Sequence, residues 1–169
     1  MSVATTHTAA PSVSQRQPYP AYKGPGVEWL GDIPVHWQAK RLRHILLRND
    51  GGVWGDDVDG KGIVVLRSTD MRVDGTWDIS SPAERKLTAA EYRAARLAIG
   101  DLVMTKSSGS ELHLGKTAIV TPEVASLNCC FSNFMQRLRG DKTAEPKFLY
   151  YVLRVRQRIN VPILRRIRT

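Results

Sequence analysis

Three segments with the composition of β-strands lie between Asp101 and Arg139, in the stretch DLVMTKSSGSELHLGKTAIVTPEVASLNCCFSNFMQRLR. The segments are residues 101–106, 116–120 and 128–139, and the last of them contains Phe131, Phe134, Met135 and Leu138. Short runs of β-branched, aromatic and other apolar residues between polar boundaries are typical of strands. These segments therefore predict a core built on a sheet.

The sequence before this stretch predicts one more strand. Residues 62–67 (GIVVLR) form a β-branched run between turn-forming residues, which indicates a buried strand, and Asp74-Gly75 indicates a turn. Residues 38–47 alternate basic and apolar residues only in part, so their periodicity fits a strand or a short helix. Residues 49–62, rich in Gly and Asp, predict a loop.

Two helices complete the predicted fold. Thr88 and Glu91 have capping-box spacing before a run of good helix formers, and Gly100 is placed to end that segment. Residues 146–159 combine Pro146 at an early helical position with apolar residues at helical spacing. Strands and helices together predict a mixed α/β fold.

The chain is long enough for one domain with tails. Residues 1–20, rich in Ser, Thr, Ala, Gln and Pro, predict a disordered N-terminal arm. Residues 25–37 place two tryptophans between Gly and Pro residues, which predicts an irregular segment held by aromatic burial at the start of the domain. We expect the folded domain to span residues 21–160 and a basic tail to span 161–169.

The charge of the chain favours a polyanionic partner. It has 25 lysine and arginine residues against 16 aspartate and glutamate residues, a formal net charge of +9. Such an excess favours nucleic acid first and an anionic membrane surface second. No window is long and apolar enough for a membrane-spanning helix, and the polar start lacks a signal-peptide apolar run, so we expect a cytoplasmic protein.

Cysteine and histidine indicate no metal or redox site. Cys129 and Cys130 are adjacent, which disfavours an ordinary disulfide and predicts two small buried side chains. The four histidines are scattered without ligand spacing or cysteine partners, at His7, His36, His44 and His113. The sequence therefore predicts no bound metal and no cofactor.

Two enzyme motifs are approximated but not met. Residues 109–117 (GSELHLGKT) end like a P-loop, but Ser110 stands where the pattern requires glycine, and the following residues have the composition of a strand instead of a helix. Residues 84–86 (ERK) resemble part of a Mg²⁺-dependent nuclease site, with possible upstream carboxylates at Asp70, Asp74 and Asp78. Charged residues in a polar loop are usually solvated, so neither motif predicts catalysis.

Basic and small polar residues form the candidate DNA contacts. Arginine can pair with guanine, hydroxyl groups can bond phosphates or base edges, and loops on a rigid scaffold often carry function. The candidates are Arg41, Arg43, Arg67, Ser68, Thr69, Lys106, Ser107, Ser108, Ser110 and Lys116. The same basic residues could instead form a solvated surface. The arginines after residue 153 could contact phosphate, or form the solvent face of a helix that packs on a missing partner.

An ordered series of short motifs resembles the specificity subunits of type I restriction–modification systems. Its opening phrase is Tyr22-Lys23 followed by GVEWLGDIP (26–34) and His36-Trp37. The later matches, in register, are LRSTDM (66–71), RL (96–97) with GDLV (100–103), TKS (105–107), LGKTA (114–118), FSNF (131–134) and PKFLYY (146–151). The resemblance covers about residues 22–160.

This resemblance implies one α/β target recognition domain with a twisted, mostly antiparallel sheet. Such a domain recognises one half of a bipartite DNA sequence and directs methyltransferase and restriction subunits. The resemblance implies that these partner subunits use S-adenosylmethionine, ATP and Mg²⁺, and that this chain has no catalytic residues. Full subunits resemble two such domains joined by long helices, so we expect this chain to be a truncated subunit, whether from a frameshifted, split or shortened gene.

Two other functions remain open at this point. A degenerate fragment could bind the methyltransferase subunit without recognising DNA, and the two weak motifs leave an ATP- or Mg²⁺-dependent enzyme as a third hypothesis. The recognised DNA sequence and the oligomeric state do not follow from the residues.

Overall fold

The computed structural model describes residues 18–26, 31–107 and 113–158. Contacts within the chain divide it into two units, Met1–Lys40 and Arg41–Thr169. The domain predicted for residues 21–160 therefore includes parts of both units. The predicted arm of residues 1–20 and the predicted tail of 161–169 lie almost entirely outside the described residues.

The described part of the first unit is a small aromatic hairpin. Strands β1 (Tyr22–Lys23) and β2 (Ile33–Pro34) pair antiparallel. Rings from Tyr19, Tyr22, His36 and Trp37 lie with centroids 5.2 to 6.4 Å apart. The predicted aromatic burial is wrong for Trp37, which is 38% exposed, because its ring contacts other surface rings instead of a core. Trp29 lies outside the described residues.

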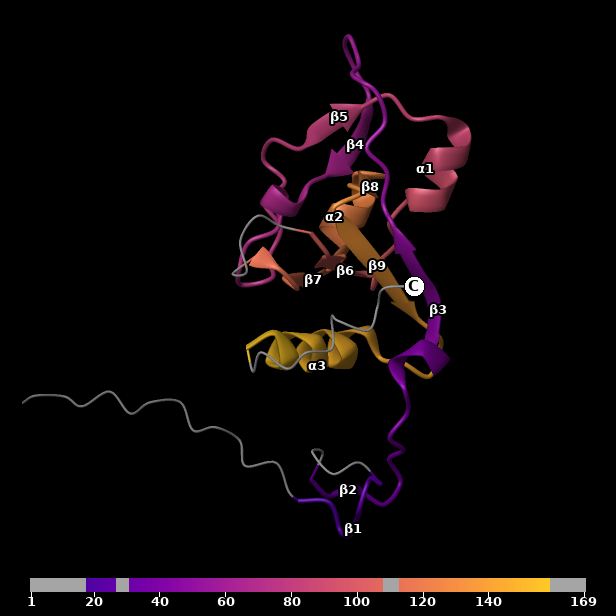
Figure 1. Ribbon diagram of the computed structural model, residues 1–169, viewed down its shortest axis with the longest axis vertical. Coiled ribbons are helices and arrows are strands. Elements are labelled where there is room, and N and C mark those ends of the chain that lie inside the picture. Colours follow the sequence, from indigo (N-terminus) through magenta and orange to yellow (C-terminus); the bar gives the residue numbers. More distant parts are fainter. Residues whose placement is uncertain (1–17, 27–30, 108–112, 159–169) are drawn as a thin grey trace, which may run out of the picture. The chain divides into compact units, whose positions relative to one another are not determined.

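The larger unit contains two sheets (Figure 1). One is a four-stranded antiparallel sheet with the order β3 (Leu46–Gly51), β9 (Met135–Gly140), β6 (Leu102–Thr105), β7 (Thr117–Ile119). The other has the order β5 (Ala83–Arg85), β4 (Ile63–Leu66), β8 (Cys130–Phe131), and only its β4–β8 pair is parallel. The prediction of a mixed fold with mostly antiparallel strands is confirmed, with the strands divided between two sheets.

One predicted strand and one predicted loop need correction. Residues 128–139 form β8 and β9 in different sheets instead of one strand, because the chain turns at Ser132–Phe134, where the Met135 amide donates to the Ser132 carbonyl at 3.0 Å. The predicted loop of residues 49–62 begins with the last part of β3, which pairs with β9 along the sheet edge. Before β3, residues 42–44 form a short helical turn, η1.

Helices α1 and α3 agree with the sequence, whereas α2 was not predicted. Helix α1 (Ala89–Ala95) begins at the capping box, where the Thr88 hydroxyl accepts from the Glu91 amide at 3.2 Å. Helix α3 spans Pro146–Arg158. Helix α2 (Pro122–Ser126) is only five residues long, with Thr121 as its N-cap. No described helix is long and apolar enough to cross a membrane.

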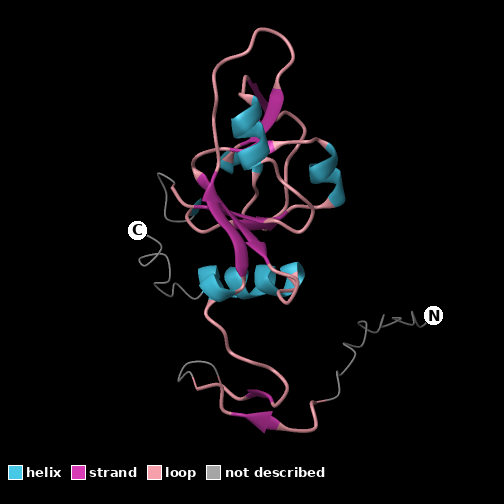
Figure 2. Ribbon diagram, turned by 90° about the vertical axis from the view of Figure 1, so that its right-hand side faces the viewer, coloured by secondary structure: helices cyan, strands magenta, loops and turns pink. Residues whose placement is uncertain are grey.

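The four-stranded sheet separates two apolar clusters. Because side chains alternate along a strand, Val103 faces a cluster with β4, β8, α1 and α2, whereas Leu102 and Met104 face Leu149 of α3. Figures 1 and 2 show this layering, with α3 on one side of the four-stranded sheet and α1, α2 and the three-stranded sheet on the opposite side. Cys129 and Cys130 are buried in the first cluster, as predicted.

Candidate nucleic-acid interface

Three loops meet at one end of the larger unit. They follow β4, β8 and β6, and we call residues 67–71, 106–107 and 132–134 the loop cluster. The Ser132 amide donates to the Leu66 carbonyl at 2.9 Å, which joins the loops after β4 and β8. The amides of Lys106 and Ser107 both donate to the Phe134 carbonyl, at 3.0 and 3.3 Å. Backbone hydrogen bonds therefore fix the three loops relative to one another.

Lys116 lies beneath the loop cluster and holds it from inside. Its side chain is buried, and its Nζ donates to the carbonyls of Ser68 and Met71 at 2.9 and 2.6 Å. Burial lowers the pKa of this amine below its ordinary value. The structure thus removes Lys116 from the surface residues that could reach a DNA phosphate, because its amine is used within the fold. The strand β7 that follows it is also incompatible with a P-loop, which opens a helix.

Arg67 is held at the surface by its neighbour three residues on. Its Nε and Nη2 donate to the carboxylate of buried Asp70 at 2.7 to 3.1 Å, and Nη2 also donates to the Ser81 carbonyl. The hydrogen bond to Asp70 raises the pKa of Arg67 further above its ordinary value. The side chain remains 39% exposed, so its guanidinium is oriented by the fold and still reachable.

The other predicted residues of this end differ in exposure. Thr69, Lys106 and Ser107 are exposed, and Ser68 is half-buried. Ser108 and Ser110 lie outside the described residues. Phe134 was not predicted as a contact, although it is 54% exposed within the loop cluster. A large exposed ring beside basic and hydroxyl groups suits a surface that contacts nucleic acid.

A polar pocket of about 270 Å³ opens beside Arg67 and Thr69. Asp70, Asp78, Ser80 and Ser81 complete its lining, and none of these four was predicted as a DNA contact. Hydrogen bonds from Ser80 and Arg72 lower the pKa of Asp78 to about 2, so its carboxylate remains an acceptor at neutral pH. The pocket thus offers a guanidinium, hydroxyl groups and an ionised carboxylate, which are the groups that pair with base edges.

Arg41 and Arg43 lie away from the loop cluster. They belong to and flank η1, before β3, whose first residue Leu46 pairs with Gly140 while its last residue Gly51 pairs with Gln136. Lys106 follows β6 next to Met135, at the other end of β9. A six-residue strand such as β3 spans roughly 17–20 Å, so the structure divides the predicted contacts into two groups.

The carboxylates of the nuclease-like motif are engaged separately. Asp70 pairs with Arg67, Asp78 pairs with Arg72 at 3.0 Å, and the Glu84 carboxylate accepts from the Gly62 amide. Within residues 18–26, 31–107 and 113–158, no three His, Cys, Asp or Glu side chains are arranged to hold a metal ion. Among the described residues, these carboxylates therefore bind separate structural partners and do not converge on one cation site.

Comparison with known proteins finds solved structures with a similar fold, at low sequence identity. No protein-family model and no curated protein matches the chain. Among solved structures, the HsdS subunit from Thermoanaerobacter tengcongensis aligns with 85% of this chain at a TM-score of 0.52 and 19% identity. A structure concerning complex assembly and conformational transition of the type I restriction–modification system aligns with 84% at 0.54 and 17%. The chain has a fold found in HsdS subunits. It spans about a third of each of these chains, 32% in both cases.

Proposed function

We propose that this chain is a DNA-recognition module that acts as a specificity subunit, or part of one, in a type I restriction–modification system. The observation that carries the proposal is the loop cluster, where Arg67, Thr69, Lys106 and Ser107 are presented together by a fold found in HsdS subunits. The formal charge of +9 favours a polyanion, and the fixed loops provide a surface with a defined pattern of donors and acceptors.

The loop cluster combines the two kinds of contact that DNA recognition needs. Lys106 and Ser107 are exposed at a strand end, where an ammonium and a hydroxyl suit phosphate oxygens. Arg67 and Asp78 line the polar pocket, where a guanidinium suits guanine and a carboxylate suits the amino group of cytosine. We therefore assign positioning on the backbone to the former pair and base recognition to the latter.

Within the system, the chain would recognise the DNA target and its partner subunits would catalyse the reactions. We propose that it recognises one half of a bipartite target and brings methyltransferase and restriction subunits to that site in the cytoplasm. Those subunits would use S-adenosylmethionine, ATP and Mg²⁺, and this chain would bind none of these cofactors itself. In this role the chain is not an enzyme.

The decisive experiment is enrichment of random duplex DNA by the purified chain, alone and with its methyltransferase subunit. The experiment is run at two fixed salt concentrations, because phosphate contacts depend on salt. We expect a short enriched half-site with the wild-type chain, its loss with Arg67→Gln, and a weaker but unaltered preference with Lys106→Gln. Lys147→Gln, which removes an exposed charge from α3, is the matched control. Binding that never exceeds random-duplex background in both preparations would contradict the proposal.

A second candidate function, binding the methyltransferase subunit without recognising DNA, is favoured by one observation. Helix α3 exposes the apolar side chains of Phe148, Tyr151 and Val152, at 50%, 56% and 40%. Exposed apolar patches often mark protein interfaces. Capture of the methyltransferase subunit that is lost with Tyr151→Asp, from a chain that enriches no DNA sequence, would establish this function in place of the first.

A further inference from the structure

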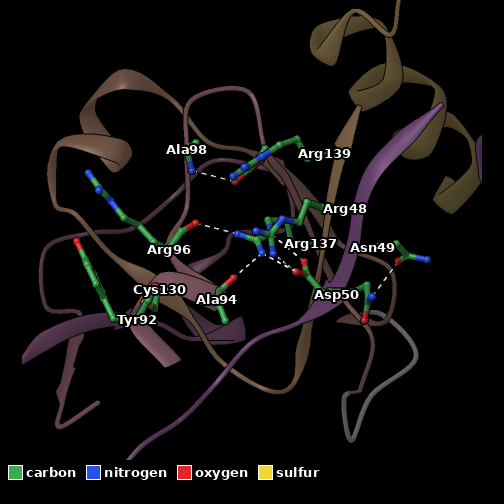
Figure 3. A network of polar contacts seen from close by, with 12 residues as sticks. Arg48, Asn49, Asp50, Tyr92, Ala94, Arg96, Ala98, Cys130, Arg137 and Arg139 are labelled. Atoms are coloured by element: carbon green, nitrogen blue, oxygen red, sulfur yellow. Dashed lines mark hydrogen bonds and ion pairs between the residues drawn. The ribbon is translucent and has the colours of Figure 1, made fainter. Parts of the chain in front are cut away.

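Three arginines surround a second pocket, of about 410 Å³, at the other end of the four-stranded sheet. Arg93 comes from α1, Arg96 caps the same helix, and Arg139 comes from β9. Leu97 and Ile99 form an apolar side of the pocket, and Ile99 is 67% exposed. Figure 3 shows that Arg96 and Arg139 belong to different parts of the chain.

Contacts inside the fold orient two of the guanidiniums without using all of their donors. Arg139 donates from Nε and Nη2 to Asp101 at 2.5 and 2.7 Å, and this hydrogen bonding raises the pKa of Arg139. Arg96 donates to the Asn128 side chain at 2.7 Å, and its guanidinium lies 5.8 Å from the Tyr92 ring centroid. Since a guanidinium carries five N–H donors, both retain donors for a ligand.

The pocket has more positive charge than its carboxylates neutralise. Asp101 is fully buried, and its carboxylate is held by Arg139. The nearby Asp50 is held by Arg137 and Arg48, as Figure 3 shows. Among the ion pairs of the described residues, none includes Arg93 or Arg96. Two guanidiniums therefore line the pocket without an ion-pair partner among the described residues.

We propose that this pocket binds a phosphate group. Three planar guanidiniums line one pocket, and a phosphate can accept several charge-assisted hydrogen bonds from such groups at once. The apolar side at Leu97 and Ile99 can pack against a sugar or base attached to that phosphate. The ligand is thus a nucleotide phosphate, either in a DNA backbone or in a free nucleotide.

The phosphate pocket is separate from the loop cluster. In the β6–β9 pair, Leu102 lies opposite Leu138 and Thr105 lies opposite Met135, so the strand end near Asp101 is remote from the end near Lys106. If the phosphate belongs to DNA, this pocket would extend the DNA contact beyond the loop cluster. If the phosphate belongs to a free nucleotide, the pocket would bind it independently of the loop cluster. The inference therefore does not depend on sequence recognition by the loop cluster.

The test is a titration of the full chain with inorganic phosphate and with AMP, followed by NMR of the arginine Nε–H groups. We expect saturable shifts of Arg93, Arg96 and Arg139, with affinity weakened roughly tenfold or more in Arg93→Gln, because a hydrogen bond to a charged group is lost. Lys147→Gln removes the same charge from an exposed site on α3 and should leave the affinity unchanged. Shifts that sodium chloride reproduces at equal ionic strength would overturn the proposal.

A DNA arm distinguishes the two sources of the phosphate. If the backbone is the source, Arg93→Gln should lower the dependence of log affinity on log salt by about one, as expected for one lost phosphate contact. If a free nucleotide is the source, Arg93→Gln should weaken AMP binding roughly tenfold or more and leave DNA binding unchanged. If the wild-type chain enriches no DNA sequence but still binds AMP, and Arg93→Gln weakens that binding, the proposed function fails while this inference stands.

Discussion

Arg137 and Asp50 are opposite each other on β9 and β3, although 87 residues separate them in the chain. Arg137 Nε and Nη2 donate to the two Asp50 oxygens at 2.9 and 2.6 Å. Arg137 is 1% exposed and also donates to the carbonyls of Ala94 and Arg96 (Figure 3). One buried guanidinium thus joins the edge strand β3, the inner strand β9 and the end of α1.

Replacing Asp50 with Asn should destabilise the fold. The amide keeps the size of the carboxylate but leaves the buried charge of Arg137 without its counter-charge. Such losses cost about 3–5 kcal/mol in buried pairs, and since Asp50 is 35% exposed we expect about 2–3 kcal/mol in urea unfolding. Arg48→Gln removes only the outer, 43% exposed partner of Asp50 and should change the free energy of unfolding by less than about 1 kcal/mol. Equal effects of the two substitutions would refute this account.

The Asp50 pair should also make stability depend on pH in the acid range. Burial alone would raise the pKa of Asp50, but hydrogen bonds from Arg137 and Arg48 outweigh it and place the pKa below 3.8. A carboxyl group whose pKa is lowered by folding stabilises the native state above its unfolded pKa, and this stabilisation is lost as pH falls through the folded pKa. The difference between wild type and Asp50→Asn should therefore be constant near neutral pH and shrink below about pH 4. Urea titrations at stepped pH measure it, and a difference that grows on acidification would contradict the argument.

Local sequence signals predicted the elements that local interactions determine. The capping box at Thr88 and Glu91 is formed as expected, and the runs at residues 62–67, 101–106 and 116–120 are strands because their side chains are apolar on core-facing positions. The split of residues 128–139 could not be predicted in this way. The turn at Ser132–Phe134 contains no Gly or Pro, and the parallel pairing of β8 with β4 joins residues far apart in the chain.

The candidate site likewise has residues fixed by local contacts and residues fixed by contacts far apart in the chain. Arg67 and Asp70 pair at a spacing of three residues, so a local contact fixes one predicted residue. Lys116 could not be distinguished from a surface lysine, because its acceptors lie 48 and 45 residues earlier in the chain. The three arginines of the second pocket lie on α1, at its C-cap and on β9, and only tertiary packing brings the α1 pair and Arg139 together.

Gly75 should be replaceable only at a high cost, because it lies in a crowded turn. Its φ is +82°, and an added Cβ would overlap the Tyr150 hydroxyl and lie 2.8 Å from the Thr117 carbonyl oxygen. Gly60 is the matched control, since its φ is +98° but an added Cβ would meet nothing within 4 Å. We expect Gly60→Ala to cost about 1–2 kcal/mol from backbone strain alone, and Gly75→Ala about 2–5 kcal/mol because steric overlap adds to it. Thermal unfolding of the two variants compares them, and equal losses would show that the Tyr150 contact does not constrain the turn.

Lys116→Met should separate the shape of the loop cluster from its charge. Methionine fills the volume of the lysine but cannot donate to the carbonyls of Ser68 and Met71, so the loop after β4 loses its internal attachment. We expect the free energy of unfolding to fall by about 1–3 kcal/mol. The value should lie near the lower end of this range, because burying the charged amine is itself unfavourable. Hydrogen exchange should accelerate at the amides of Asp70 and Asp78, which bond the Arg67 and Asp70 carbonyls within this loop.

The effect of Lys116→Met on DNA should be the reverse of the effect of Lys106→Gln. With the surface charges intact, Lys116→Met should keep the salt-dependent background affinity but lose the preference for a particular half-site, because base contacts require fixed loops. Lys106→Gln should instead retain the fold and the preference while weakening binding to all sequences, with the salt slope reduced by about one. Competition between an enriched half-site duplex and random duplex distinguishes the two patterns. If Lys116→Met lowered the affinity for both duplexes equally, with unchanged exchange at Asp70, the buried lysine would have no role in shaping the loop cluster.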